Sequence, residues 1–164
     1  MKVILIAALS ADGFIARNTD ELADWTGSED KKLFVELTKR AGVMVMGRTT
    51  FETIGRALPG RQTIVYSHRP LEIPGVTVTD ESPTDLVQRL AATGQQELAI
   101  CGGAAVYTQF MQAGVVDELY LTVVPCLFGG GVTLFSQPLE SSLRLLETRS
   151  LSDDVITLHY EVQK

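Results

Sequence analysis

Short runs of apolar residues without polar alternation recur along the chain and are separated by more polar stretches. Such runs are typical of strands that are covered on both faces, as in a parallel sheet. The runs read VILIAAL from Val3, GVMVMG from Gly42, QTIVYS from Gln62, ELAIC from Glu97 and ELYLTVV from Glu118.

Helical patterns occupy the stretches between these runs. They cover residues 29–40, with Ser28 as the candidate N-cap, and residues 50–54, 84–92 and 104–111. The alternation of strands and helices predicts an α/β fold with a mostly parallel central sheet flanked by helices.

The C-terminal part has a different pattern. Residues 143–150 and 155–163 are predicted to be two strands joined by the turn SLSDD. We expect them to pair as an antiparallel C-terminal edge of the parallel sheet. No repeat or linker interrupts the chain, so residues 1–164 are predicted to form one domain.

Composition narrows the partners that the chain is expected to have. Its hydrophobic content of 45% and charged content of 21% are those of an ordinary globular domain. The formal net charge of −6 argues against binding to nucleic acid or to an anionic membrane, but leaves room for a local basic pocket that holds a phosphorylated small molecule. No apolar stretch is long enough to cross a bilayer, and residues 3–9 fit a buried strand better than a secretory signal.

Metal and disulfide chemistry is not expected. Cys101 and Cys126 do not form a Cys-x-x-Cys pair and are interpreted as reduced thiols of a cytoplasmic protein. His68 and His159 have no partners at metal-ligand spacing, so the residues alone favour structural or surface roles for both.

The first helical pattern carries an acid on its apolar face. Positions 30, 34, 37 and 41 form one stripe, which reads Asp, Phe, Leu, Ala. Asp30 has two interpretations: a first-turn carboxylate favoured by the helix dipole, as for Glu29, or the polar group of a cleft. In a cleft its two oxygens would accept parallel N–H bonds from a flat ligand, with Phe34 over the ligand's ring.

Glycine and basic residues follow three of the strand runs. ICGGAAVY places Gly102 and Gly103 between a strand and a helix, where the backbone can approach a phosphate, although a tight turn alone also needs glycine. MGRTTFETIG and YSHRP supply further candidate anion-binding groups. Strand ends of this kind meet at one edge of a parallel sheet, which predicts a ligand with several phosphates. Arg61, after the Pro-Gly turn of ALPGR, fits either a carboxylate ligand or solvent.

The order of these segments resembles the dihydrofolate reductase family and the related riboflavin-pathway reductase domain. The resemblance covers nearly the whole chain and implies a single dihydrofolate reductase-like domain that reduces dihydrofolate by hydride transfer from NADPH. The matching segments are IAALSADGFIA, the tryptophan followed by SEDKKLF, VMGRTTFETIGRALPGR, ICGGAAVY and DELYLTVV.

The resemblance implies a substrate site around the pterin ring. Asp30 matches the family's pterin-binding acid and Trp25 lies at the matching distance before it, so both are candidate catalytic residues. Phe34 matches the aromatic that covers the ring, and Arg61 matches the residue that pairs with the folate tail. The implied substrate-binding residues are Ile6, Ala7, Asp30, Phe34, Ile54, Arg61, Cys101 and Thr122.

The resemblance also implies where NADPH would bind. The glycine turn matches the pyrophosphate segment, and Ser67 and Arg69 lie where the family grips the 2′-phosphate. The implied cofactor-binding residues are Ala8, Ile15, Gly47, Arg48, Thr49, Thr50, Ser67, His68, Arg69, Cys101, Gly102, Gly103, Ala104, Ala105, Val106 and Tyr107.

Three departures from the family pattern keep other functions open. The segment 17–24 is longer than the usual mobile loop. The stretch PCLFGGGVTLF resembles the riboflavin branch, with Val132 where dihydrofolate reductases often have Asp. The glycine turn reads Gly-Gly-Ala, so Ala104 adds a methyl group near the phosphates. The alternatives are a reductase of a ribosylamino-pyrimidine phosphate and a non-catalytic binder of pterin or nucleotide. The resemblance fits either a monomer or a homodimer.

Overall fold

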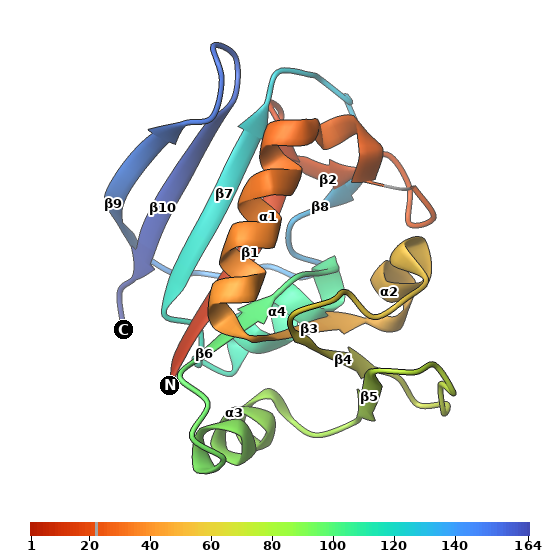
Figure 1. Ribbon diagram of the computed structural model, residues 1–164. Coiled ribbons are helices and arrows are strands. Elements are labelled where there is room, and N and C mark those ends of the chain that lie inside the picture. Colours follow the sequence, from red (N-terminus) through yellow and green to blue (C-terminus); the bar gives the residue numbers. More distant parts are fainter. Residues whose placement is uncertain (22) are drawn as a thin grey trace.

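An eight-stranded sheet forms the centre of the computed structural model, which describes residues 1–21 and 23–164 (Figure 1). Its strand order is β5-β4-β3-β6-β1-β7-β10-β9. Neighbours from β5 to β7 pair in parallel, whereas β10 is antiparallel to both β7 and β9. The predicted parallel sheet with an antiparallel C-terminal edge is therefore confirmed. The strands are β1 (Lys2–Ser10), β3 (Val43–Gly47), β4 (Gln62–Tyr66), β5 (Val76–Thr79), β6 (Glu97–Ile100), β7 (Glu118–Val124), β9 (Leu143–Ser150) and β10 (Ile156–Val162).

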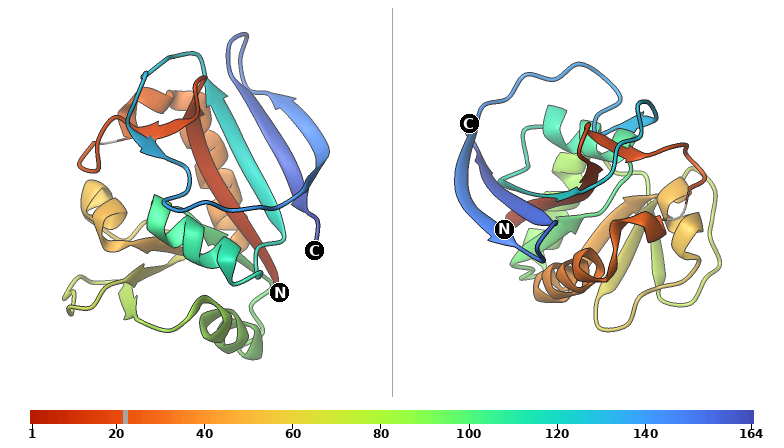
Figure 2. Two further views of the ribbon diagram at one scale, coloured as in Figure 1. Left: turned by 180° about the vertical axis from the view of Figure 1, so that it is seen from behind. Right: turned by 90° about the horizontal axis from the view of Figure 1, so that it is seen from above.

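Helices cover both faces of this sheet (Figure 2). Helix α1 (Ser28–Ala41) and the short α2 (Arg48–Ile54) pack on one face, and α3 (Pro83–Ala92) and α4 (Ala104–Gln112) pack on the other. A 3₁₀ turn, η1 (Ala23–Thr26), precedes α1. The predicted Ser28 cap is wrong: Gly27, with φ 89°, turns the chain one residue earlier, so Ser28 already belongs to the helix.

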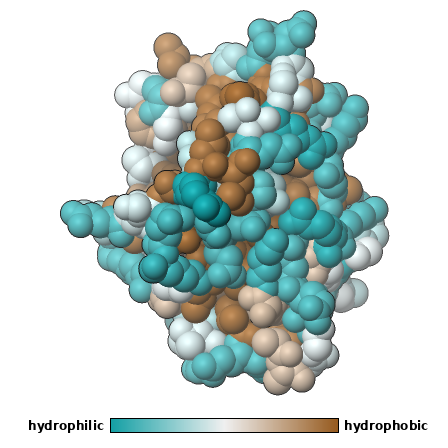
Figure 3. Space-filling view, turned by 90° about the vertical axis from the view of Figure 1, so that its left-hand side faces the viewer, coloured by the Kyte–Doolittle hydropathy of each residue, from teal (hydrophilic) through white to brown (hydrophobic). Residues whose placement is uncertain are grey.

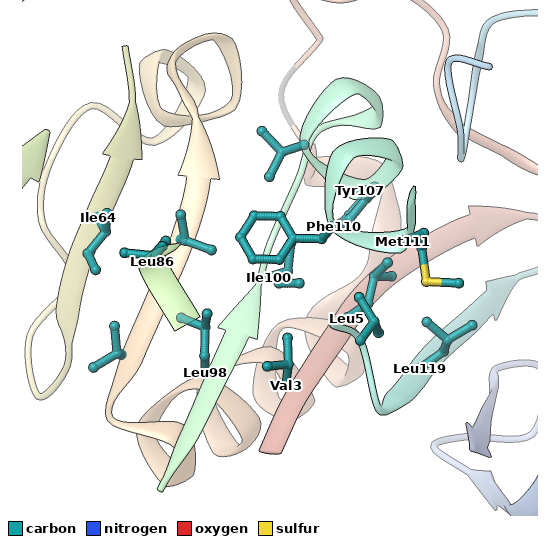
Figure 4. Close-up of a cluster of buried hydrophobic side chains, with 14 of the residues drawn as sticks. Val3, Leu5, Ile64, Leu86, Leu98, Ile100, Tyr107, Phe110, Met111 and Leu119 are labelled. Carbon is teal, nitrogen blue, oxygen red and sulfur yellow. The ribbon is translucent and has the colours of Figure 1, made fainter. Parts of the chain in front are cut away.

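The two helical layers explain why the strand runs lack alternation. Along β1, Val3 and Leu5 pack under α3 and α4, whereas Ile4 and Ile6 pack under α1. Successive side chains of a strand point to opposite faces, so a strand covered on both faces is apolar throughout. Figure 4 shows the α3/α4 side of this core, with Phe110 of α4 packed over the strands.

The outer edge of the sheet is more exposed. Strand β9 pairs with β10, and its side chains Leu143, Leu145 and Leu146 are 38%, 51% and 41% exposed. Figure 3 shows apolar surface among polar groups on this side of the molecule. Within the described residues, no helix is both long enough and apolar enough to span a bilayer.

Candidate active site

The C-terminal ends of the central parallel strands meet at one edge of the sheet. The Cys101 backbone N–H donates to the Val45 carbonyl over 2.9 Å, and the Gly47 N–H donates to the Gly102 carbonyl over 2.8 Å. These bonds hold the ends of β3 and β6 together, and ligands of open parallel sheets bind beyond such ends.

Asp30 lies in the first turn of α1 and is directed at the sheet. Burial raises the pKa of its carboxyl group, while hydrogen bonding from Thr26 and Thr122 and the charge of Lys31 act in the opposite direction. Its neighbour Glu29 instead pairs with Lys32 over 3.1 Å at the surface. The difference favours the cleft interpretation of Asp30, because a dipole preference alone would apply equally to both acids.

Two further titratable side chains lie near Asp30. The Tyr107 hydroxyl, which is buried, donates to the Ile6 carbonyl over 2.5 Å. Burial raises the pKa of Tyr107 well above 10, with Cys101 and Asp30 adding to the shift. Burial also raises the pKa of the Cys101 thiol to about 12, so both groups are protonated at neutral pH. Of these three groups, Asp30 is therefore the one that can be ionised at neutral pH.

An apolar wall and one arginine complete this side of the site. Phe34, Ile54 and Cys101 pack against the core on the α1 side. Arg61 Nη1 donates to the Pro59 carbonyl over 2.5 Å, and its Nε atom is buried with no hydrogen-bond partner in residues 1–21 and 23–164. Burial lowers the pKa of Arg61, and a smaller electrostatic interaction between Arg61 and Cys101 places the guanidinium group on the side of the site that carries Cys101.

Some implied substrate-site residues lie elsewhere. The Ala7 side chain packs in the α3/α4 core, on the opposite face from Asp30, so only its backbone can reach the Asp30 side. Trp25 packs edge-on against Phe128 with ring centroids 4.9 Å apart. The structure also adds Leu58, which packs on the same core as Ile54. The sequence signal for Leu58 was its apolar side chain between Ile54 and Arg61.

The glycine turn leaves a bare backbone at the start of α4. The Gly102–Gly103 peptide is cis, and α4 begins at Ala104 with no side-chain cap. A Cβ atom at Gly103 would lie 3.1 Å from Thr50 Oγ1, so a side chain has little room there. Backbone N–H groups at such a helix start fit a phosphate group.

A second set of polar groups lies beside the end of β4. Arg48 Nη1 donates to Ser67 Oγ over 2.9 Å, and Ser67 Oγ also accepts the Arg69 backbone N–H over 3.1 Å. Arg48 Nε pairs with Glu52. His68, Arg69 and Thr49 are exposed. The structure therefore brings the Arg48 side chain to Ser67, whereas Arg69 contacts Ser67 through its backbone N–H and carbonyl groups.

The remaining implied cofactor residues divide between surface and core. Ala105 is exposed, whereas Val106 is buried in the α3/α4 core, where Ile15 also packs. Ala8 is half-buried and lies opposite Thr122 in the β1–β7 register. Across the described ranges 1–21 and 23–164, no cluster of three or more His, Cys, Asp or Glu side chains is arranged to hold a metal ion.

Asp12 joins two loops close to Trp25, a contact that sequence reasoning missed. Its carboxylate accepts the Gly129 N–H over 2.7 Å, the Phe128 N–H over 3.1 Å and the Ser10 hydroxyl over 2.6 Å. These bonds lower the pKa of Asp12 to about 2. Strand β2 (Phe14–Ala16) also pairs with β8 (Val132–Thr133), so the two loops are tied at two places.

Removal of the Asp12 carboxylate is expected to loosen this connection. In Asp12→Ala, hydrogen exchange of the Gly129 amide should accelerate about tenfold or more, because a charged acceptor is lost. Asp154→Ala, which changes an exposed acid of the β9–β10 turn, is the control. Because the pKa of Asp12 is lowered, its contribution should persist at neutral pH and fade only as the pH falls toward 2. Unchanged exchange at Gly129 would contradict the assignment.

Comparisons with known proteins agree with this architecture. The family model described as dihydrofolate reductase matches residues 2–162. Dihydrofolate reductase type 3 of Salmonella typhimurium is 36% identical over 131 residues, covering 79% of this chain and 76% of that protein. The uncharacterized protein YwjB of Bacillus subtilis is 28% identical over 170 residues, with 97% of each chain covered. The crystal structure of a putative riboflavin biosynthesis protein from Shewanella sp. PV-4 superposes with a TM-score of 0.85 and 27% identity, covering 100% of both chains.

Proposed function

Because the chain belongs to the dihydrofolate reductase family, we propose that it reduces 7,8-dihydrofolate to tetrahydrofolate with NADPH. One observation carries this proposal: the half-buried Asp30 carboxyl, whose pKa is raised by burial, shares its helix face with Phe34 and Leu37, which pack in the core on the α1 side. An acid in such a place suits a flat heterocycle that offers parallel N–H donors.

The residues present fit NADPH. The bare backbone of Gly102 and Gly103 and the start of α4 suit the pyrophosphate, because a Cβ atom at Gly103 would crowd Thr50. Arg48, Ser67 and Arg69 suit the 2′-phosphate, since the Arg48 guanidinium group lies on Ser67 and Arg69 follows two residues later with an exposed side chain. When bound, this cofactor supplies the hydride for the pterin ring.

The chain's own residues would orient the substrate and control its charge. Asp30 would bind the amino edge of the pterin, and its negative charge would favour protonation at N5 of the ring, with a water completing proton delivery. Phe34 and Ile54 would cover the ring and exclude water. The Tyr107 hydroxyl, held on the Ile6 carbonyl, would keep that strand end in place beside the nicotinamide.

A second candidate is the reduction of a ribosylamino-pyrimidine phosphate in riboflavin biosynthesis. It is favoured by the full-length superposition on the Shewanella protein, whose name assigns it to riboflavin biosynthesis. An absorbance assay at the NADPH band, with dihydrofolate, other pterins and the pyrimidine as separate substrates, distinguishes the candidates. We expect oxidation of NADPH with dihydrofolate. Turnover of the pyrimidine alone would favour the second candidate, and no turnover at all would favour a non-catalytic binder.

Arg61 is proposed to bind the carboxylate of the folate tail. Arg61→Ala should raise the KM for dihydrofolate about tenfold, because a hydrogen-bonded ion pair is lost, and should change kcat little. A pterin substrate that lacks the glutamate tail serves as the control and should show nearly the same KM with both proteins. Equal increases for the two substrates would contradict this role.

A further inference from the structure

Two buried threonines face each other beside Asp30. Thr122 of β7 and Thr157 of β10 are directly opposite in the antiparallel register, and each is 2% exposed. Their Oγ1 atoms lie 2.8 Å apart, which is a hydrogen bond in which either hydroxyl could be the donor. Residues opposite one another in an antiparallel pair share a face of the sheet, so both hydroxyls lie on the side that carries α1 and Asp30.

The number of protons fixes the direction of this bond. A threonine hydroxyl has one proton to donate and can accept at its oxygen. Thr122 lies opposite Ala8 and Thr157 on the α1 face of the sheet, the face that Asp30 is directed at, and its hydroxyl opposes the rise in the pKa of the Asp30 carboxyl group. A hydroxyl favours the ionised carboxylate by directing its proton to it. The proton between the two threonines must then come from Thr157. The order is Thr157 to Thr122 to Asp30.

We propose that Thr157 is a positioning residue that orients the Thr122 hydroxyl toward Asp30 and so supports the ionised carboxylate. The inference rests on the proposed role of Asp30 in substrate binding. Thr157 acts by donating to Thr122 Oγ1. A hydroxyl that accepts a hydrogen bond is a stronger donor, and the occupied acceptor site keeps its own proton from rotating away.

The other groups around Asp30 come from different elements. Thr26 of η1 hydrogen-bonds with it, Lys31 of α1 adds a positive charge, and Tyr107 of α4 faces it from the other side. Burial keeps Tyr107 protonated at neutral pH because it raises the pKa of the phenol. A substitution at position 157 leaves all of these groups in place, so its effect on Asp30 is transmitted through Thr122.

The test is the titration of the Asp30 carboxyl carbon by NMR in the ligand-free protein, with Asp30→Asn used to assign the signal. Thr157→Val keeps the shape of the side chain and removes its hydroxyl. We expect the pKa of Asp30 to rise by about half a unit in Thr157→Val and by about one unit in Thr122→Val. Thr157→Ser retains the hydroxyl and should restore the wild-type value. If Thr157→Val does not fold, Thr157→Ala makes the same comparison.

Thr63→Val is the matched control, because Thr63 is also a fully buried strand threonine but its hydroxyl has no hydrogen-bond partner among the described residues. It should leave the pKa of Asp30 unchanged. A pKa shift in Thr122→Val without one in Thr157→Val overturns the proposal, as does the absence of a shift in both. In turnover assays the pH profile of Thr157→Val should move upward with the titration. A wild-type protein without dihydrofolate turnover would refute the proposed function but would leave the titration result intact.

Discussion

Replacement of Asp30 by asparagine is expected to lower kcat for dihydrofolate at pH 7 by about 10²- to 10⁴-fold. The variant keeps the size of the side chain but loses the negative charge that would favour a proton on the pterin. It also replaces one of the two acceptor oxygens with a donor, so the amino edge of the ring would be bound less well. Affinity for NADPH, measured by fluorescence titration, should be nearly unchanged, because the residues proposed to bind its phosphates are untouched.

Glu29→Gln is the control for this substitution. Glu29 is the adjacent carboxylate of the same helical turn, but it pairs with Lys32 at the surface. Its turnover should remain close to that of the wild-type protein. If Asp30→Asn retained near-normal turnover at neutral pH, the proposed role of Asp30 would be refuted. A similar loss in both variants would indicate a general effect of charge on α1.

The raised pKa of Asp30 also predicts how the thermal stability of Asp30→Asn depends on pH. Burial disfavours the ionised carboxylate in the folded state, so ionisation of Asp30 costs stability above its folded pKa. Asp30→Asn should therefore have a higher Tm than the wild-type protein at pH 7. The difference should vanish below the unfolded-state pKa of about 4, where both side chains are neutral. Thermal melts at pH 7 and pH 3.5 measure it.

The fold was predictable where the hydrophobic pattern of a single segment is enough to specify its secondary structure. The unalternating apolar run of β1 predicted a strand covered on both faces, and its side chains indeed divide between two cores. Strand β5 was missed because its sequence VTVT is short and only partly buried. The Ser28 cap was wrong because Gly27 adopts a backbone conformation that a sequence pattern does not specify.

Some contacts of the candidate site could not be predicted from the sequence, because they join residues of different segments of the chain. The helical stripe of Asp30 and Phe34 was visible in the sequence, because helix periodicity places both on one face. The Thr122–Thr157 pair depends on the register of β7 with β10, and the contacts of Asp12 depend on two distant loops. Such cross-strand and loop contacts are set by the tertiary structure, so the local pattern gave no signal for Thr157 or Asp12.

Substitution of Arg48 by methionine is expected to lower kcat/KM for NADPH about 100-fold while changing kcat/KM for NADH much less. Arg48 donates to Ser67, and its guanidinium group is proposed to pair with the 2′-phosphate that only NADPH carries. A hydrogen bond to a charged group contributes about 1.5 to 3 kcal/mol, which corresponds to roughly a 10- to 150-fold change in affinity. Methionine fills a similar volume without any donor, so the loss should be specific to the phosphate. The measurement is the ratio of kcat/KM values for the two cofactors with dihydrofolate as substrate.

Arg144→Gln is the control for Arg48→Met, because Arg144 pairs with Glu161 at the β9 edge, away from the glycine turn. This variant should keep the wild-type preference for NADPH and so exclude a general effect of net charge. Arg69→Gln, at the exposed arginine of the subsite, should lower the NADPH preference in the same direction, and the double variant should bring the two cofactors close to parity. Equal losses for NADPH and NADH in Arg48→Met would mean that Arg48 binds a phosphate common to both cofactors. The 2′-phosphate would then have to be held by other groups near the end of β4.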